Sequence, residues 1–219
     1  MRLGFRPFGS LFCACYLLLE PLRAFDTPLS DLAVREAYFL GQRHDDSLAE
    51  FLNKYTQHLE APQSGPHIAS VSFFTPYALT AIHSSERQGY SAQQAQVDHE
   101  KTAEVVRVEV HIWLTATYGE YIVRPVDSRS GSNKGLQFRP ADFWREFRVR
   151  VLEKDQMVIP VSADGQPVFR CGEDACDLAG ATLAFEFPAE AFTADTATVV
   201  VTPPEGRAVS VDFEPFSLR

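Results

Sequence analysis

The chain has 219 residues, of which 20 are basic and 29 are acidic, so its formal net charge is −9. A surface this acidic repels phosphate backbones, and we therefore expect no nucleic-acid partner. Hydrophobic residues make up 45% of the chain and include 17 Phe. This composition is typical of a folded globular protein and excludes a disordered tail.

The first residues have the order of a secretory signal. Arg2 and Arg6 precede an apolar run from Phe8 to Leu19, and the small residue Ala24 follows. The run is too short to span a bilayer. We therefore expect residues 1–24 to be a signal peptide and the protein to be exported to the periplasm, the cell surface or the extracellular space. Removal of this segment would leave 17 basic and 28 acidic residues and no transmembrane span.

Two alternatives exist for the same segment. Phe12 to Cys15 form a crude lipoprotein box in which Cys15 would carry a lipid anchor, but Phe12 is a poor match for that motif. A partly buried amino-terminal helix is the other alternative, and Glu20 and Arg23 near its end argue against it. We expect the plain signal peptide and no lipid anchor.

Export would leave Cys171 and Cys176 as the only cysteines. In an oxidising compartment they predict a disulfide that closes a small loop, with a contribution of about 2 kcal/mol to stability. A redox motif would need closer cysteines, and a zinc site would need two further ligands. The nearby acids Glu173, Asp174 and Asp177 do not have the spacing of a calcium loop, so we expect no metal and no cofactor.

Helical patterns dominate residues 25–66. Apolar residues from 32 to 40 recur at helical spacing, and Gly41 can end that helix. Ser47 and Glu50 form a capping box for a second helix whose apolar stripe continues to Leu59. These patterns predict a helical hairpin with one apolar side that packs on the rest of the protein.

From residue 67 the period changes to that of strands. We expect two short strands, 68–74 and 77–83, hinged at Thr75 and Pro76. A capping box at Ser91 predicts a short polar helix that ends near Thr102. Strict alternation follows from 106 to 114, with Val, Ile and Leu side chains on one face and Arg107, Glu109, His111 and Trp113 on the other. One face of this strand should belong to the core and the other should contact solvent at least in part.

The remaining residues predict a series of short strands. We expect 121–126 to pair with the preceding strand and Asp164 and Gly165 to form a tight hairpin. Residues 127–135 have the composition of a loop, and the order of Lys134 and Gly135 does not match a phosphate-binding motif. The other expected strands are 147–151, 157–162, 166–171, 181–187, 198–202 and 209–213. Short strands at this spacing predict an antiparallel β-sandwich region over residues 67–219.

Positive charge is concentrated between residues 124 and 150. This cluster is either a solvated sheet face or a patch for an acidic partner or an anionic glycan, with neighbouring aromatic residues adding contact area. The candidate partner surface consists of Arg139, Phe143, Trp144, Arg148 and Arg150.

Catalytic signatures are not evident. His99 lies beside two acids, but Ala103 stands where a helical zinc motif needs its second histidine. The chain contains no Gly-x-Ser-x-Gly motif. His111 and Trp113 share the outer face of the long strand, where they either pack under another segment or form a platform for a ligand. We assign no catalytic residue.

The segments 37–43, 75–78 and 209–219 resemble exported bacterial proteins of unassigned activity that end in an immunoglobulin-like β-sandwich. The resemblance implies that fold and assigns no site residue. We expect an α+β protein in which a helical hairpin packs on an antiparallel, immunoglobulin-like β-sandwich. We further expect a non-catalytic envelope or extracellular module that binds a protein or a glycan. The alternative is an exported, hydrolase-like enzyme whose site is assembled from distant residues.

Overall fold

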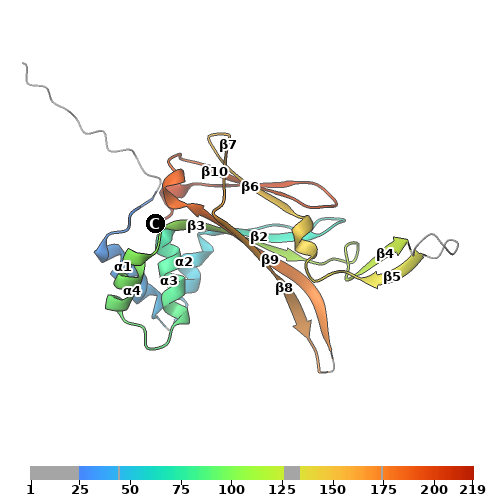
Figure 1. The fold of residues 1–219 in the computed structure, drawn as a ribbon, viewed down its shortest axis with the longest axis horizontal. Helices are drawn as coiled ribbons and strands as arrows, with labels where there is room; N and C mark the ends of the chain where they lie inside the picture. Colours follow the sequence, from blue (N-terminus) through green and yellow to red (C-terminus); the bar gives the residue numbers. More distant parts are fainter. Residues whose placement is uncertain (1–24, 44, 126–133, 174) are drawn as a thin grey trace, which may run out of the picture.

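The computed structural model describes residues 25–43, 45–125, 134–173 and 175–219. The predicted signal peptide, Cys15 and most of the predicted loop 127–135 lie outside the described residues. The fold combines α-helices with antiparallel sheets, and the helices gather at one end of the molecule while the sheets extend away from them (Figure 1).

Two larger antiparallel sheets and one ribbon contain the strands of the described residues. The five-stranded sheet has the order β1 (Thr56–His58), β2 (His67–Phe74), β3 (Val105–Trp113), β9 (Cys176–Pro188) and β8 (Ser162–Cys171). The four-stranded sheet has the order β11 (Val209–Phe213), β10 (Ala197–Thr202), β6 (Arg148–Glu153) and β7 (Gln156–Val158). The ribbon consists of β4 (Tyr121–Pro125) and β5 (Lys134–Phe138).

The main core lies between the two larger sheets. On β3 every second residue from Val106 to Ile112 is buried, which confirms the predicted alternation. Phe73 on β2 packs against Phe213 of the opposite sheet, with ring centroids 5.5 Å apart, and against Phe192, at 5.2 Å. Because these side chains come from both sheets and are almost fully buried, the two sheets form one hydrophobic unit.

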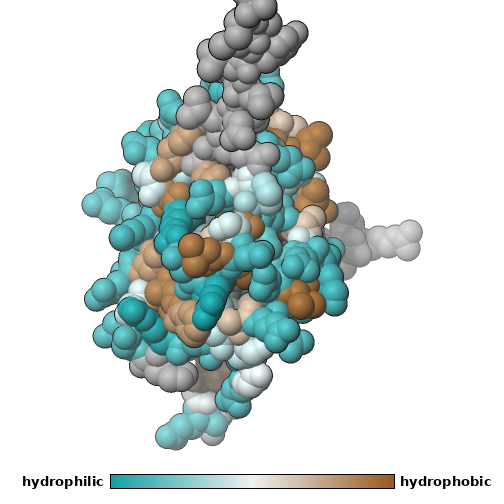
Figure 2. Space-filling view, turned by 90° about the vertical axis from the view of Figure 1, so that its left-hand side faces the viewer, coloured by the Kyte–Doolittle hydropathy of each residue, from teal (hydrophilic) through white to brown (hydrophobic). Residues whose placement is uncertain are grey.

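Four helices form the other end of the molecule: α1 (Asp31–Gly41), α2 (Ser47–Asn53), α3 (Pro76–Glu86) and α4 (Ala92–Lys101). Helix α1 packs mainly on α3 and α4. Gly41 permits this approach, since a Cβ there would lie 2.1 Å from the carbonyl oxygen of Ala81. Both helices predicted in residues 25–66 are present, but the second ends at Asn53 because the chain then pairs as β1 with β2. The surface of this end carries scattered hydrophobic side chains among hydrophilic ones (Figure 2).

The prediction of a strand over residues 77–83 is wrong, because this segment belongs to α3. Thr75 is the N-cap, and its hydroxyl accepts a hydrogen bond from the backbone N–H of Ala78 at 3.4 Å. Pro76 occupies the first helical turn, where its missing N–H costs no hydrogen bond. Thr followed by Pro is therefore the start of a helix here. By contrast, the predicted helix after Ser91 is confirmed as α4.

Two predicted connections between strands are also wrong. Asp164 and Gly165 lie inside the continuous strand β8, where Gly165 faces Leu183 of β9 and Trp144 covers it. The tight turn lies instead at Lys154 and Asp155, whose φ angles of 49° and 63° are positive, between β6 and β7. The segment that begins at Tyr121 pairs with β5 and not with the preceding strand.

Candidate functional site

A polar groove lies on the face of the five-stranded sheet that points away from the core. Its floor is strand β9, which lies between β3 and β8 and presents the small residues Thr182 and Ala184 to this face. The flanking strands β3 and β8 present longer side chains, so they form the walls. We call this feature the β9 groove; its volume is about 450 Å³. Its polar lining consists of Arg107 and Glu109 from β3, Ser162, Asp164 and Gln166 from β8, and Glu186 from the end of β9 itself.

One end of the groove is closed by charged side chains. The guanidinium of Arg107 donates to the Glu186 carboxylate at 2.8 Å and lies 3.9 Å from the carboxylate of Glu109. Ser162 donates its hydroxyl hydrogen to the same Glu186 side chain at 3.0 Å. The hydrogen bond from Arg107 is the main reason that the pKa of Glu186 lies below its usual value. Glu186 is therefore ionised at neutral pH.

Trp113 extends the outer face beyond the groove. Its register partner on β9 is Gly180, and a Cβ at that glycine would lie 2.8 Å from an indole carbon of Trp113. The same Cβ would lie 2.1 Å from the carbonyl oxygen of Ile112, so glycine allows both the backbone of β3 and the indole to approach β9 closely. Gly180 is buried there, while Trp113 is 37% exposed. A partly exposed indole beside a sheet offers a planar apolar surface on which a second flat apolar surface can stack.

Polar groups fill the space between the indole and the charged end. His111 and Thr182 are register partners, and the Thr182 hydroxyl lies 3.1 Å from His111 Nδ1. Asp164 accepts a hydrogen bond from the backbone N–H of Gly165 through one carboxylate oxygen at 2.8 Å. Gln166 is exposed on the wall formed by β8. The groove therefore offers both donors and acceptors in a row along the strands.

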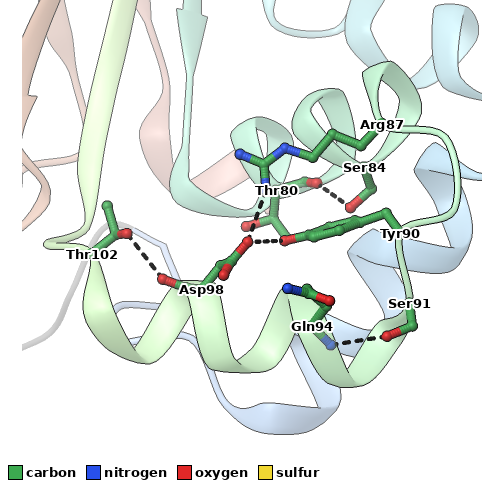
Figure 3. Close-up of polar contacts among 8 residues, drawn as sticks. All are labelled: Thr80, Ser84, Arg87, Tyr90, Ser91, Gln94, Asp98 and Thr102. Atoms are coloured by element: carbon green, nitrogen blue, oxygen red, sulfur yellow. Dashed lines mark hydrogen bonds and ion pairs between the residues drawn. The ribbon is translucent and has the colours of Figure 1, made fainter.

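A second, smaller cavity lies between α3 and α4 and has a volume of about 250 Å³. Several of its ionisable groups are paired with one another (Figure 3): Arg87 donates to Asp98 at 2.8 Å, and the Tyr90 hydroxyl donates to the same carboxylate at 2.9 Å. His99 Nε2 lies 3.0 Å from Glu104. These contacts hold α4 in place against α3 and the preceding loop.

His83 also lines this cavity. Burial lowers the pKa of its imidazole, and the nearby positive charge of Arg107 lowers it further. His83 is consequently neutral at pH 7. Within the described residues, no group of three or more His, Cys, Asp or Glu side chains is placed to hold a metal ion.

The residues of the predicted partner surface are not equivalent in the structure. Phe143 is 3% exposed and belongs to the core, so the expectation that its ring contacts a partner is wrong. Arg139 stacks on Tyr118, with its guanidinium carbon 3.6 Å from the ring centroid. Trp144 is half-buried over Gly165. Arg148 and Arg150 are exposed on β6, where they share one face, and their role in binding stays a prediction.

The disulfide prediction is confirmed. Cys171 and Cys176 are bonded, with 1.99 Å between the sulfur atoms and 3.9 Å between the Cα atoms. They are also register partners at the end of the β8–β9 hairpin. The bond therefore links the two strands that form the floor and one wall of the groove, at the end of the hairpin that lies farthest from the four-stranded sheet (Figure 1).

Sequence reasoning singled out Trp113 and His111 as a possible platform but missed the groove beside them. The available signal was the run of small residues Gly180, Thr182 and Ala184 at alternate positions of one strand. That signal acquires meaning only once β9 is known to lie between β3 and β8. No helix in the described part of the chain is long and apolar enough to cross a membrane. The sequence matches no protein-family model and no curated protein.

Proposed function

We propose that the protein is a non-catalytic, exported binding module that holds a neutral oligosaccharide in the β9 groove. The observation that carries this proposal is the combination of a small-residue floor, polar walls and the flat indole of Trp113 on one sheet face. We also propose that the two packed sheets are immunoglobulin-like, as the resemblance in the sequence implies.

A sugar chain fits this combination of groups. Its hydroxyls both donate and accept hydrogen bonds, while the C–H face of each ring is apolar. The groove supplies carboxylate acceptors from Glu109 and Asp164 and donors from Arg107 and Gln166. Trp113 supplies a surface for stacking. From Trp113 to Arg107 the strand spans six residues, or about 20 Å at 3.3 Å per residue, so the site is long enough for several sugar units.

The charges of the groove favour a neutral sugar over an anionic one. Arg107 is already paired with Glu186, and two further carboxylates, Glu109 and Asp164, line the walls. An anionic ligand would meet repulsion from these groups and from a chain whose net charge is −9. Phosphate-rich or sulfated polymers are therefore poor ligands for this site.

The state of Glu186 does not suit this carboxylate to the acid role in glycoside hydrolysis. A glycosidase needs one carboxylic acid whose pKa is raised so that it can protonate the leaving oxygen. Arg107 has the opposite effect on Glu186, whose pKa is lowered. The alternative of an exported hydrolase finds its best support in the α3–α4 cavity, where His83 and His99 both contribute to the lining.

The test is calorimetric titration with the neutral hexasaccharides cellohexaose and chitohexaose. We expect the wild type to bind at least one of them, and Trp113→Ala to weaken that binding at least tenfold, because the stacking surface is lost. Phe216→Ala is the matched control, since Phe216 is 41% exposed and lies outside the groove.

Two results would contradict the proposal. One is the absence of heat from either hexasaccharide, and the other is an equal loss of affinity in the Trp113 and Phe216 variants. Chromatography of the sugars after prolonged incubation tests the alternative, because shortened products would assign hydrolysis to the protein.

A further inference from the structure

The α3–α4 cavity is lined by a polar stripe from each of its two helices. Thr80 and Ser84 lie one turn apart on α3, and Asp98 and Thr102 lie one turn apart at the end of α4 (Figure 3). All four side chains line the cavity, which among the described residues shares no lining residue with the β9 groove. The cavity is therefore a second, separate hollow of the molecule.

The hydroxyl groups of these stripes donate their hydrogens to the helices themselves. Thr80 donates to the carbonyl oxygen of Pro76 at 2.9 Å, and Ser84 donates to that of Thr80 at 2.7 Å. Thr102 donates to the carbonyl oxygen of Asp98 at 2.9 Å. Because a hydroxyl has a single hydrogen, each of these oxygens can only accept a further hydrogen bond.

Asp98 adds a carboxylate oxygen with no donor among the described residues. Arg87 and the Tyr90 hydroxyl both donate to the same oxygen of Asp98, Oδ2, at 2.8 Å and 2.9 Å. The other oxygen, Oδ1, receives no hydrogen bond from the described part of the chain. It therefore offers its lone pairs, and a share of the negative charge, to a ligand.

Donors are scarcer than acceptors in this lining. The Nε2 atom of His99 lies 3.0 Å from Glu104 and is directed at that carboxylate. The neutral imidazole of His83 has a single N–H. Arg87 has further N–H groups, but its side chain is 50% exposed and its guanidinium carbon stacks 4.9 Å from the ring centroid of Tyr90. A ligand inside the cavity thus meets mainly acceptor oxygens.

The rest of the lining is largely apolar, and the cavity limits the size of a ligand. Leu79, Ala95 and Val105 contribute hydrocarbon surface. The volume of about 250 Å³ holds about eight non-hydrogen atoms at about 30 Å³ each, the share of a water molecule in the liquid. A ligand that fits is small, has an apolar body and carries one group that donates several hydrogen bonds. An ammonium group meets that requirement, because it has three donors and no acceptor.

We propose that the α3–α4 cavity binds a small primary amine in its ammonium form. The ammonium donates to Oδ1 of Asp98 and to the hydroxyl oxygens of Thr80 and Thr102, while the apolar body contacts Leu79 and Ala95. The net charge of −9 favours the approach of such a cation. This ligand differs in class from the oligosaccharide proposed for the β9 groove, and each site can be tested without the other.

Titration followed by proton–nitrogen correlation NMR spectra tests the proposal. The probes are benzylamine, benzyl alcohol and benzoate, which have the same ring but differ in charge. We expect benzylamine, which is protonated at neutral pH, to shift amide signals of α3 and α4 in a saturable manner. Benzyl alcohol should bind at least tenfold more weakly, because hydrogen bonds from a charged donor are about twice as strong as neutral ones. Benzoate should not bind, since its acceptors would face the acceptors of the lining.

Asp98→Asn should weaken benzylamine binding at least tenfold, because the substitution keeps the shape of the side chain and removes its charge. The matched control is Asp164→Asn, which removes a carboxylate from the β9 groove and should bind benzylamine like the wild type. Ala103→Leu is a second test that leaves every polar side chain intact. Ala103 is exposed and lines the cavity, so a larger side chain there should narrow the cavity and weaken benzylamine binding at least tenfold.

Thermal unfolding of each variant checks the fold, and if Asp98→Asn loosens α4, the result for Ala103→Leu decides. The proposal is overturned if benzylamine gives no saturable shifts, if benzyl alcohol or benzoate binds as tightly as benzylamine, or if Ala103→Leu keeps full affinity. An equal loss in Asp98→Asn and Asp164→Asn would also overturn it, because the amine would then lie in the β9 groove. Titration of the same samples with the hexasaccharides tests the groove separately, so the failure of one site is distinguished from the failure of the other.

Discussion

The inner and outer faces of the five-stranded sheet are formed by the same strands but differ in the size and packing of their side chains. On the inner face of β3, Val106, Val108, Val110 and Ile112 are at most 1% exposed, and each fills space left by its neighbours. On the outer face the size of side chains changes from strand to strand, from long on β3 to small on β9. A core requires close packing of all its side chains. A groove requires small side chains on one strand, so that space remains between the longer side chains of the two neighbouring strands.

Strand β9 shows this difference within a few residues. Leu183 and Phe187 point to the core and are at most 2% exposed. Thr182 and Ala184, on the opposite face, leave room above them. Inner-face substitutions should therefore reduce stability, and outer-face substitutions should reduce binding.

The largest effect should follow from a change on the inner face. Phe73 is fully buried and packs on Phe192 and Phe213. Phe73→Ala should lower the free energy of unfolding by about 3 to 5 kcal/mol, because it removes a large buried ring and leaves a cavity. Urea unfolding measures this loss.

Phe169→Ala is the control for that measurement. Phe169 is 51% exposed near the end of β8, and its removal should change the free energy of unfolding by less than about 0.5 kcal/mol. A loss below about 1 kcal/mol for Phe73→Ala would show that the two sheets do not share one core.

The part of the fold that the sequence predicts well depends on periodicity alone. The alternation along β3 needs no knowledge of neighbouring strands, and the side-chain cap at Ser91 is local to α4. Strand pairing is different, because it depends on contacts between residues far apart in the chain. Asp164 and Gly165 resemble a turn, yet Gly165 is small because Trp144 covers it. Nothing near Gly165 in the sequence reveals that contact.

The next prediction concerns the floor of the groove. Ala184→Leu adds a side chain that would occupy the space between β3 and β8, so it should weaken oligosaccharide binding at least tenfold while leaving the core unchanged. Titration with the hexasaccharide that binds the wild type measures this effect. The control is Ala163→Leu, since Ala163 is exposed on β8 and its register partner Phe185 lies on the other face.

An unchanged affinity in Ala184→Leu would place the ligand elsewhere on the protein. A parallel fall in stability and affinity in this variant would instead mean that the two faces are not separable. Urea unfolding of the same sample distinguishes these cases, because the proposed separation requires an unfolding free energy within about 0.5 kcal/mol of the wild-type value.

The candidate site was less predictable than the fold for a physical reason. Trp113 and His111 could be assigned to an outer face from alternation, and this assignment is correct. Asp164, Gln166 and Glu186 reach the same groove from β8 and β9, which follow β3 in the chain by about fifty residues or more. Their convergence is a property of strand order. Arg139 and Phe143, in contrast, were grouped by sequence proximity although one stacks on Tyr118 and the other is buried.

The smallest effect should come from the titration of His83. This side chain lines the α3–α4 cavity, and its pKa depends on the charge of Arg107, which closes one end of the groove. Its pKa is lowered first by burial and then by Arg107 and Arg87, while Glu86 and Glu186 act in the opposite direction. The folded protein therefore holds His83 neutral at a pH where the unfolded chain, with a histidine pKa near 6.5, already binds a proton. Stability should be complete above about pH 6.5 and should fall as the pH is lowered through the range between 6.5 and the folded-state pKa.

His83→Gln isolates this contribution, because glutamine keeps a polar side chain but does not titrate. Urea unfolding at about pH 7.5 and about pH 5.5, on either side of the unfolded histidine pKa, should show a larger loss of stability on acidification in the wild type than in the variant. The carboxylates and the other histidines titrate in both proteins and cancel in the comparison. Equal losses would mean that protonated His83 is accommodated beside Arg107, and that the helical end does not respond to the charges that close the groove.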